Sequence, residues 1–524
     1  MSLSEKLREP KWVLVLLFGI IIGGTFLRTY QFHDFLRFNA DQSRDATLVR
    51  DYVAGKEELP LLGPKAGGTS FRVGPAFYYF QIASAKIFGS HPDTVAYPDL
   101  FFALLTLPLL FFFLRKYFDS KTALLLVALF AVSLYAIKYS RFAWNPNSLP
   151  FWSMLFLYGL HEIMVERERT WKWWAVLTGG ALGIGVQLHS LSLIIFPLMC
   201  LGVFGYLWKQ KKHHVWKTML VVVVVAVTLN IPQLVSEVKT GGENISAFFN
   251  SIGAKGEKGD GLVQNAVKNV VCFSQSTAYI LSAYDSSDTC EIKSVSKGLN
   301  MPVFIFGFFV FVGGCALCVR ALRREVDESK KYFLGIVLSY VVLTFGILLP
   351  LANEISMRFF LIIPFMPLVF LGVWYTSAEE FFPRVSQIVF WFGVVVLFSL
   401  NLWAVEKSFT RYQSYLTHSS AGMDNVLLKE VEVASSYIIS HAGDATKVAV
   451  SGDAQYLFKA LKSMQYFTEQ AGIQLVQKKK SSDPALQEFL IENTKQNQAI
   501  MEKRSDIADA LTFGRFTIYS IESK

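Results

Sequence analysis

The segment "WVLVLLFGIIIGGTFL" (residues 12–27) decides the fold class, because it holds no charge and suits a membrane crossing together with its flanking residues. It follows Lys6, Arg8 and Lys11, and no small-residue cleavage site precedes the polar residues after it. We therefore predict a retained first transmembrane helix whose N-terminus lies in the cytoplasm.

The composition of the whole chain agrees with a membrane protein. Of its 524 residues, 52% are hydrophobic and 17% are charged, whereas soluble domains carry about 25% charged residues. The net charge of +9 is explained by Lys and Arg in cytoplasmic loops. No stretch alternates basic and aromatic residues in a soluble module, so we expect no nucleic-acid partner.

A window of about 19 residues predicts a polytopic α-helical protein with about 11 transmembrane helices. The predicted spans lie near residues 11–29, 95–114, 121–138, 148–164, 173–188, 191–208, 216–232, 301–319, 332–351, 358–376 and 385–404. With a cytoplasmic N-terminus, the loops that lie on the cytoplasmic side are rich in Lys and Arg, which supports this orientation. We expect the membrane to be a plasma or inner membrane.

This topology divides the chain into a transmembrane domain (1–404) and an extracytoplasmic tail (405–524). The tail is more polar, and "KVAVSG", "GIQLVQ" and "RFTIYSI" are typical of strands. The stretch "DPALQEFLIENTK" (483–495) is predicted to be helical, so we expect a small α/β domain. A long outer loop at 233–299 contains Cys272, which can pair with Cys290 if the compartment is oxidising.

The first outer loop (30–94) is predicted to contain two helices. The first is "FNADQSRDATLVRDY" (38–52), and a Gly- and Pro-rich linker follows it. The second, "GPAFYYFQIASAKIFG" (74–89), has the aromatic and apolar residues of a helix that lies in the membrane interface. In the first helix Asp41 and Asp45 share a face, whereas the adjacent Arg44 and Asp45 do not.

Polar side chains recur at the outer mouths of the predicted helices. A single interfacial Arg is ordinarily an anchor whose charge reaches the membrane surface. Several on one side can instead surround an anionic lipid headgroup, with carboxylates available for proton transfer. The candidates are Asp41, Arg44, Asp45, Lys65, Arg72, Arg141, Asn145, His189, Glu354 and Arg358.

Four motifs carry a resemblance to a known family. Asp41 followed by "QSRDA", then "FRVGPAFYYF", "YSRFAWNPNSLPF" and "QLHS", resembles the membrane glycosyltransferases of the C-type fold. The protein O-mannosyltransferase and aminoarabinose-transferase superfamily is the nearest likeness, and it extends in layout over residues 10–405. The resemblance implies transfer of a sugar from a polyprenyl-phosphate donor to a hydroxyl of a lipid, glycan or protein acceptor.

The resemblance also implies roles for the candidate residues. Asp41 matches the family's catalytic acidic residue and is the expected general base, with inversion at the anomeric carbon. Asp45 and Asn145 are candidates for a second acidic or acceptor-binding position, and Arg72, Arg141 and Arg358 for binding the donor phosphate. Supporting roles are expected for Arg44, Lys65, His189 and Glu354, the last by orienting Arg358 across one helical turn.

Two departures from the family pattern bear on metal use. Gln42 stands where the family often has Glu, and Asn145 stands where some members have a second Asp. We therefore expect no required cofactor and no metal at the catalytic site, although a divalent cation remains an alternative.

Two other functions compete with an enzyme. A transporter or flippase of lipid-linked saccharides predicts polar residues through the membrane midplane and broken helices in paired halves. The predicted spans are apolar at their centres, which favours a site at the outer face. A catalytically inactive scaffold is favoured only by Gln42 and Asn145.

Overall fold

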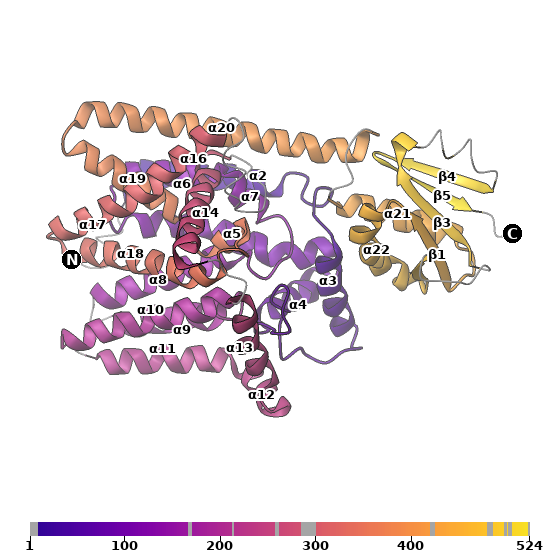
Figure 1. Cartoon of the computed structure of the whole chain (residues 1–524), viewed down its shortest axis with the longest axis horizontal. Helices are drawn as coiled ribbons and strands as arrows, with labels where there is room; N and C mark the ends of the chain where they lie inside the picture. The colour runs from indigo at the N-terminus through magenta and orange to yellow at the C-terminus, as the bar shows by residue number, and fades with distance from the viewer. Residues whose placement is uncertain are drawn as a thin grey trace.

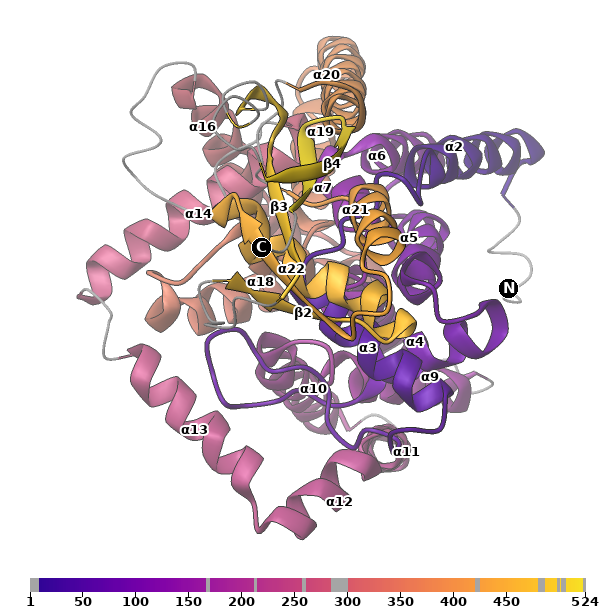
Figure 2. The ribbon, with the colours of Figure 1, turned by 90° about the vertical axis from the view of Figure 1, so that its right-hand side faces the viewer.

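The protein consists of a helical bundle with a five-stranded sheet domain at one end (Figure 1). The computed structural model describes residues 9–165, 170–211, 214–256, 261–283, 300–419, 425–478, 486–496, 500 and 506–521. Figure 2 looks onto the sheet domain along the bundle.

Six helices are long and apolar enough to cross a membrane within the described ranges. They are α2 (Lys11–Thr29), α5 (Pro92–Leu114), α10 (Ser190–Lys209), the segment Met301–Arg324, α18 (Glu328–Leu348) and α20 (Pro383–Thr417). The segment Met301–Arg324 joins α16 (Asn300–Phe308) to α17 (Gly314–Arg324) through one π-helical turn. Large apolar side chains such as Val15, Phe18 and Phe26 are exposed on α2, as expected of a surface that faces lipid.

The remaining predicted spans coincide with shorter or bent helices. These are α6 (Ser120–Val132), α7 (Leu134–Lys138), α8 (Leu149–Val165), α9 (Trp171–Gly185), α11 (Val215–Leu229) and α19 (Met366–Glu379). Helix α11 bends by 61° into α12 (Ile231–Thr240). The multi-pass helical architecture is confirmed, while the number of complete crossings stays a prediction.

Both predicted helices of the first outer loop are present. Helix α3 (Ala40–Val53) and helix α4 (Ala76–Phe88) lie between the bundle and the sheet domain (Figure 1). Helix α4 buries Phe77, Tyr78 and Ile82, and only its last turn exposes the apolar side chains of Ile87 and Phe88. Helix α4 is therefore packed within the protein along most of its length and ends in one apolar tip.

The predicted outer loop at 233–299 is mostly helical where it is described. After α12 come α13 (Glu243–Gly256) and α14 (Leu262–Ser282). The C-terminal half of α14 is buried, and its last carbonyls accept hydrogen bonds from Ser133 Oγ and Asn401 Nδ2, each at 2.8 Å. Cys272 is buried in this helix, whereas Cys290 lies outside the described residues.

The C-terminal sheet has the order β2-β1-β3-β5-β4. Strands β1 (Lys447–Gly452), β2 (Gln474–Gln477) and β3 (Glu488–Asn493) are parallel, and β5 (Phe516–Ile521) pairs antiparallel with β3 and with β4 (Ile507–Phe513). Helices α21 (Leu428–His441) and α22 (Ala454–Thr468) complete the domain.

The three predicted strands are confirmed as β1, β2 and β5. The predicted helix over "DPALQEFLIENTK" is wrong, because its apolar run forms the central strand β3. A short continuous apolar run fits a buried strand and a helix equally well until its neighbours are known.

Two segments of the bundle reach the sheet domain. Helix α20 runs without a break past the predicted domain boundary at residue 404 and ends at Thr417. The chain before α3 pairs with the start of α21: Phe38 N donates to Val426 O (3.1 Å) and Leu428 N donates to Leu36 O (2.8 Å).

A buried ion pair closes this junction. Arg515 Nε and Nη2 donate to the two carboxylate oxygens of Glu430 at 2.7 and 2.8 Å, and both side chains are fully buried. The guanidinium also lies 3.9 Å from the ring centroid of Tyr415, near the end of α20. Arg515 immediately precedes β5, and its side chain thus contacts both α21 and α20.

We expect Arg515→Ala to lower the free energy of unfolding of the sheet domain by about 3–5 kcal/mol, because it leaves the Glu430 carboxylate buried without its ion pair. Hydrogen exchange of the β1 and β3 amides in the full-length protein measures this. Arg411→Ala, at an exposed position of α20, is the control. Equal protection in the two variants would contradict the prediction.

Candidate functional site

The N-terminus of α3 is fixed to the bundle by Gln42. Its Oε1 accepts a hydrogen bond from Asn39 N at 3.2 Å, and its Nε2 donates to Ala143 O at 3.2 Å. An amide can accept and donate at once, whereas an ionised Glu can only accept. Gln42, a departure from the family pattern, therefore has a structural role here: it holds α3 against the turn at residues 140–147.

Two carboxylates on α3 share one guanidinium. Arg44 Nη1 lies 3.0 Å from Asp41 Oδ1, and Arg44 Nε lies 2.9 Å from Asp45 Oδ1. The side chain of Asp41 is 66% exposed and that of Asp45 is 1% exposed. Asp41 and Asp45 lie on one face of α3 as predicted. Arg44 and Asp45 are adjacent and do not share a face, but the long Arg44 side chain folds back and contacts Asp45.

The buried carboxyl group of Asp45 has a second partner. Tyr78, on α4, donates its hydroxyl to Asp45 Oδ1 at 2.9 Å. Burial raises the pKa of Asp45 to about 6, while the contacts with Arg44 and Tyr78 act in the opposite direction. Asp45 therefore anchors Arg44 and joins α3 to α4, and Asp41 is the carboxylate that faces solvent.

A cationic surface adjoins the same 140–147 turn. Arg358 is exposed, and its guanidinium carbon lies 5.8 Å from the ring centroid of Trp144 and 5.6 Å from that of Phe359. Within the described chain it forms no ion pair, so its charge is available to a ligand. A Cβ atom on Gly67 would lie 3.5 Å from Arg358 Nη2, which places the linker beside this side chain.

The linker carries two more of the predicted cations. Lys65 and Arg72 pair as an antiparallel β-bridge, so the two side chains leave one short hairpin. Arg72 Nε donates to Gly63 O at 2.8 Å, and the Arg72 backbone exchanges two hydrogen bonds with the Asn244 amide of α13. The hairpin is thereby fastened to the arm formed by α12 and α13.

Asn145 and His189 brace the same region. Asn145 Nδ2 donates to Leu188 O at 2.6 Å, and His189 Nδ1 accepts from Leu191 N at 3.1 Å, which caps α10. The His189 ring stands edge-on to Phe359, with centroids 5.6 Å apart. These contacts join the 140–147 turn, the start of α10 and the segment that carries Arg358.

Arg141 is directed elsewhere. Its guanidinium donates to the carbonyls at the end of α2, and the residue is 4% exposed. The acceptors are Leu27, Arg28, Tyr30 and Gln31, at 2.6–3.3 Å. This geometry assigns Arg141 to the end of α2, where unpaired carbonyls need donors, and removes it from our phosphate-binding candidates.

The expected pair of Glu354 with Arg358 is absent although both residues are described. The prediction assumed one continuous α-helix. Instead a 3-10 turn (Leu349–Leu351), an irregular stretch and a second 3-10 segment (Met357–Ile362) occupy this region. The i and i+4 positions therefore do not share a helix face, and Glu354 is exposed.

Sequence reasoning missed two side chains of this site. The sequence indicates only that Tyr78 belongs to an aromatic helix and that Trp144 belongs to the motif "AWNPN". The helical spacing of Tyr78 gives no sign that its hydroxyl reaches Asp45, because that contact depends on how α4 packs on α3.

Known proteins show the same architecture. The family described as dolichyl-phosphate-mannose-protein mannosyltransferase matches residues 72–235. No curated protein sequence matches the chain significantly. The chain is similar to ArnT from Cupriavidus metallidurans bound to undecaprenyl phosphate, with a TM-score of 0.53 at 10% identity over 97% of this chain and 98% of that one. The chain has the C-type fold.

A second structure supports this likeness. The oligosaccharyltransferase of Archaeoglobus fulgidus in complex with zinc and sulfate has a TM-score of 0.51 at 12% identity, over 97% of this chain and 73% of that one. Both matches extend over 97% of this chain, so the C-type fold is shared along nearly its whole length.

The structure predicts that Asp45 titrates near pH 6 and that Tyr78→Phe raises this midpoint, because the hydroxyl donates to the ionised carboxylate. Infrared spectroscopy of the carboxyl band, assigned by its loss in Asp45→Asn, follows the titration. Tyr79→Phe is the control, since the Tyr79 hydroxyl donates to Pro60 O instead. A midpoint that Tyr78→Phe leaves unchanged would contradict the assignment.

The same shift sets the sign of the stability effect. The folded-state pKa of Asp45, about 6, lies above the reference value of 3.8. The folded state therefore holds this proton at pH values where the unfolded chain has lost it, and the contribution of Asp45 to stability decreases as the pH rises from about 4 through 6.

Proposed function

We propose that the protein transfers a sugar from a polyprenyl-phosphate donor to a hydroxyl group of a lipid, glycan or protein acceptor. The observation that carries this proposal is the exposed Asp41 carboxylate, held by Arg44, which Asp45 and Tyr78 fix from the buried side. The C-type fold and the match to mannosyltransferases over residues 72–235 support the reaction class.

In this reaction Asp41 is the general base. It accepts the proton of the acceptor hydroxyl as that oxygen attacks the anomeric carbon. The bond between the anomeric carbon and the phosphate oxygen breaks, and polyprenyl phosphate leaves with the bonding electrons. Attack opposite the leaving group inverts the anomeric centre. Arg44 is a positioning residue, because its guanidinium lies 3.0 Å from Asp41 Oδ1 and orients that carboxylate.

The leaving phosphate requires cationic donors. Arg358 is exposed, and Lys65 and Arg72 lie in the hairpin beside it, so we assign the phosphate to these three side chains. Charge-assisted hydrogen bonds are strongest where water is excluded, as at the mouth of a bundle that faces lipid. His189 and Asn145 support this surface through their contacts with the neighbouring turns.

We further propose that sugar transfer at this site uses no metal. Asp45 is engaged by Arg44 and Tyr78, and the Asn145 amide nitrogen is bound to Leu188 O, so neither of these two candidates is a free second carboxylate with which Asp41 could bind a cation. The orientation that fits this chemistry has a cytoplasmic N-terminus and an extracytoplasmic sheet domain, in a plasma or inner membrane.

Asp41→Asn is expected to lower the rate of sugar transfer by about 10²–10⁴-fold, because an amide cannot accept the proton. Transfer from polyprenyl-phosphate-linked sugars to membrane acceptors, followed with labelled donor in proteoliposomes, measures the rate. Asp51→Asn makes the same substitution near the other end of α3, where Asp51 pairs with Arg50, and serves as the control. Retained turnover in Asp41→Asn would refute the base.

Arg358→Gln is expected to raise the KM for the donor by about 10–100-fold, because it removes one or two charge-assisted hydrogen bonds to the phosphate. Arg358→Lys should restore part of the affinity. Arg384→Gln, at an exposed position near the start of α20, is the control. If Arg358→Gln changes neither KM nor donor binding, the phosphate lies elsewhere.

The same proteoliposomes separate the enzyme from a transporter. Labelled donor that crosses the bilayer without loss of its sugar would support the transporter or flippase. Release of polyprenyl phosphate together with a glycosylated acceptor supports the transferase.

A further inference from the structure

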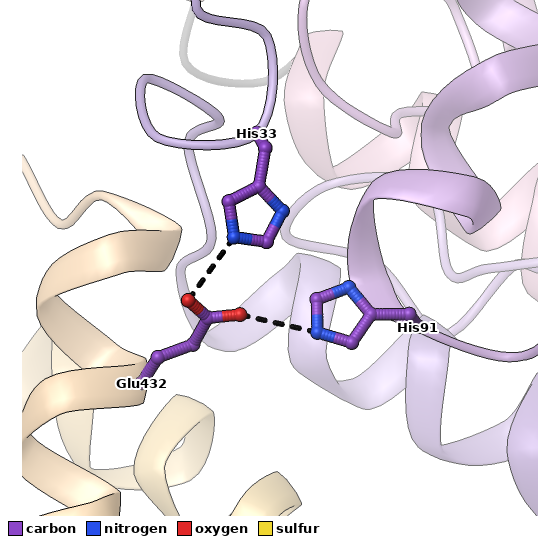
Figure 3. Close-up of side chains that lie close together, drawn as sticks. All are labelled: His33, His91 and Glu432. Carbon is purple, nitrogen blue, oxygen red and sulfur yellow. Dashed lines mark hydrogen bonds and ion pairs between the residues drawn. The ribbon is translucent and has the colours of Figure 1, made fainter.

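Two histidines and a glutamate converge where the sheet domain meets the bundle (Figure 3). His33 lies between α2 and α3, His91 precedes α5, and Glu432 lies on α21. His33 Nε2 is 3.1 Å from one carboxylate oxygen of Glu432, and His91 Nε2 is 3.1 Å from the other. One atom from each of the three side chains lies within 4.8 Å of the others.

A second carboxylate holds both rings from behind. Asp93 Oδ2 lies 3.2 Å from His33 Nδ1, and Asp93 Oδ1 lies 2.7 Å from His91 Nδ1. The two rings are stacked, with centroids 5.4 Å apart. A histidine that binds metal through Nε2 keeps its proton on Nδ1 and donates it to a carboxylate, which fixes the tautomer and the ring plane. Asp93 provides this partner for both rings at once.

The spacing of the ligand atoms is compatible with one ion. Bonds of 2.0–2.1 Å at the tetrahedral angle place neighbouring ligand atoms about 3.3 Å apart. Each histidine Nε2 lies 3.1 Å from a different oxygen of Glu432, and one atom from each side chain lies within 4.8 Å of the others, so a small adjustment brings them onto a common ion. Two imidazole nitrogens with one carboxylate form a donor set typical of zinc. The side chains of His33 and His91 are 40% and 41% exposed, so an ion can enter from solvent and keep a water molecule as its fourth ligand.

We propose that His33, His91 and Glu432 bind a divalent transition metal, with zinc as the preferred ion, and that this ion fastens the sheet domain to the outer end of the bundle. The ligands come from both parts of the protein, so the ion joins them directly. None of the three is a candidate residue for sugar transfer, and the inference does not depend on that activity.

Metal binding is tested on full-length protein in detergent, stripped with a chelator and dialysed. We expect one equivalent of Zn²⁺ to bind, and Co²⁺ to give the visible absorption of a four-coordinate site. Glu432→Gln and His91→Gln should abolish both signals. Asp93→Asn should weaken binding by about 10–100-fold, as expected for a residue that orients ligands.

His441→Gln is the matched control, because His441 lies on the same helix as Glu432 and pairs with Asp509 instead. It should bind one equivalent with unchanged affinity. Failure of the wild-type protein to bind Zn²⁺, or equal binding by wild type and Glu432→Gln, would overturn the site.

The fastening role has its own measurement. Zn²⁺ should slow hydrogen exchange of the α21 amides in the wild-type protein and in His441→Gln, and should leave Glu432→Gln unchanged. Stoichiometric binding without slower exchange would overturn the fastening role. Exchange that Zn²⁺ slows equally in Glu432→Gln would overturn the assignment of Glu432. Sugar transfer enters neither readout, so failure here is distinguishable from failure of the proposed enzyme.

Discussion

The end of the bundle nearest the sheet domain depends on the guanidinium of Arg141. Helix α2 ends at Thr29 with carbonyl groups that have no partner within the helix, and lipid supplies none. Arg141 donates to four carbonyls there and so joins α2 to the 140–147 turn. That turn also receives Gln42 from α3 and supports Arg358 through Trp144. Both sides of the candidate site are thus built on one turn.

The sequence predicts the helices and strands that depend on local interactions. Apolar runs predicted the helices of the bundle, because a membrane crossing needs its own internal hydrogen bonds and an apolar surface. Alternation and β-branched residues predicted β1, β2 and β5. Strand β3 escaped prediction because its three apolar residues, Phe489–Ile491, are explained only by the strands on both sides of them.

The sequence does not show which groups each charged side chain contacts. Arg141 and Arg358 have the same signature in the sequence, a basic residue among aromatics at a helix mouth. Packing separates them: Arg141 is turned toward backbone carbonyls, and Arg358 is exposed on aromatic faces. Helical spacing predicts that Asp41 and Asp45 share a face. It does not predict that Asp45 is buried while Asp41 is exposed, because this difference depends on the packing of α4, whose Tyr78 contacts Asp45.

Helix α20 extends from the bundle to the sheet domain (Figure 1). Its 35 residues contain no Gly or Pro after Gly393 and span about 52 Å, well beyond a hydrocarbon layer of about 30 Å. A flexible linker would tolerate added residues, but a continuous helix turns by about 100° and rises by 1.5 Å with each one. The length of α20 therefore sets where Tyr415 meets the sheet domain: one residue inserted before Tyr415 would rotate its ring away from the guanidinium of Arg515.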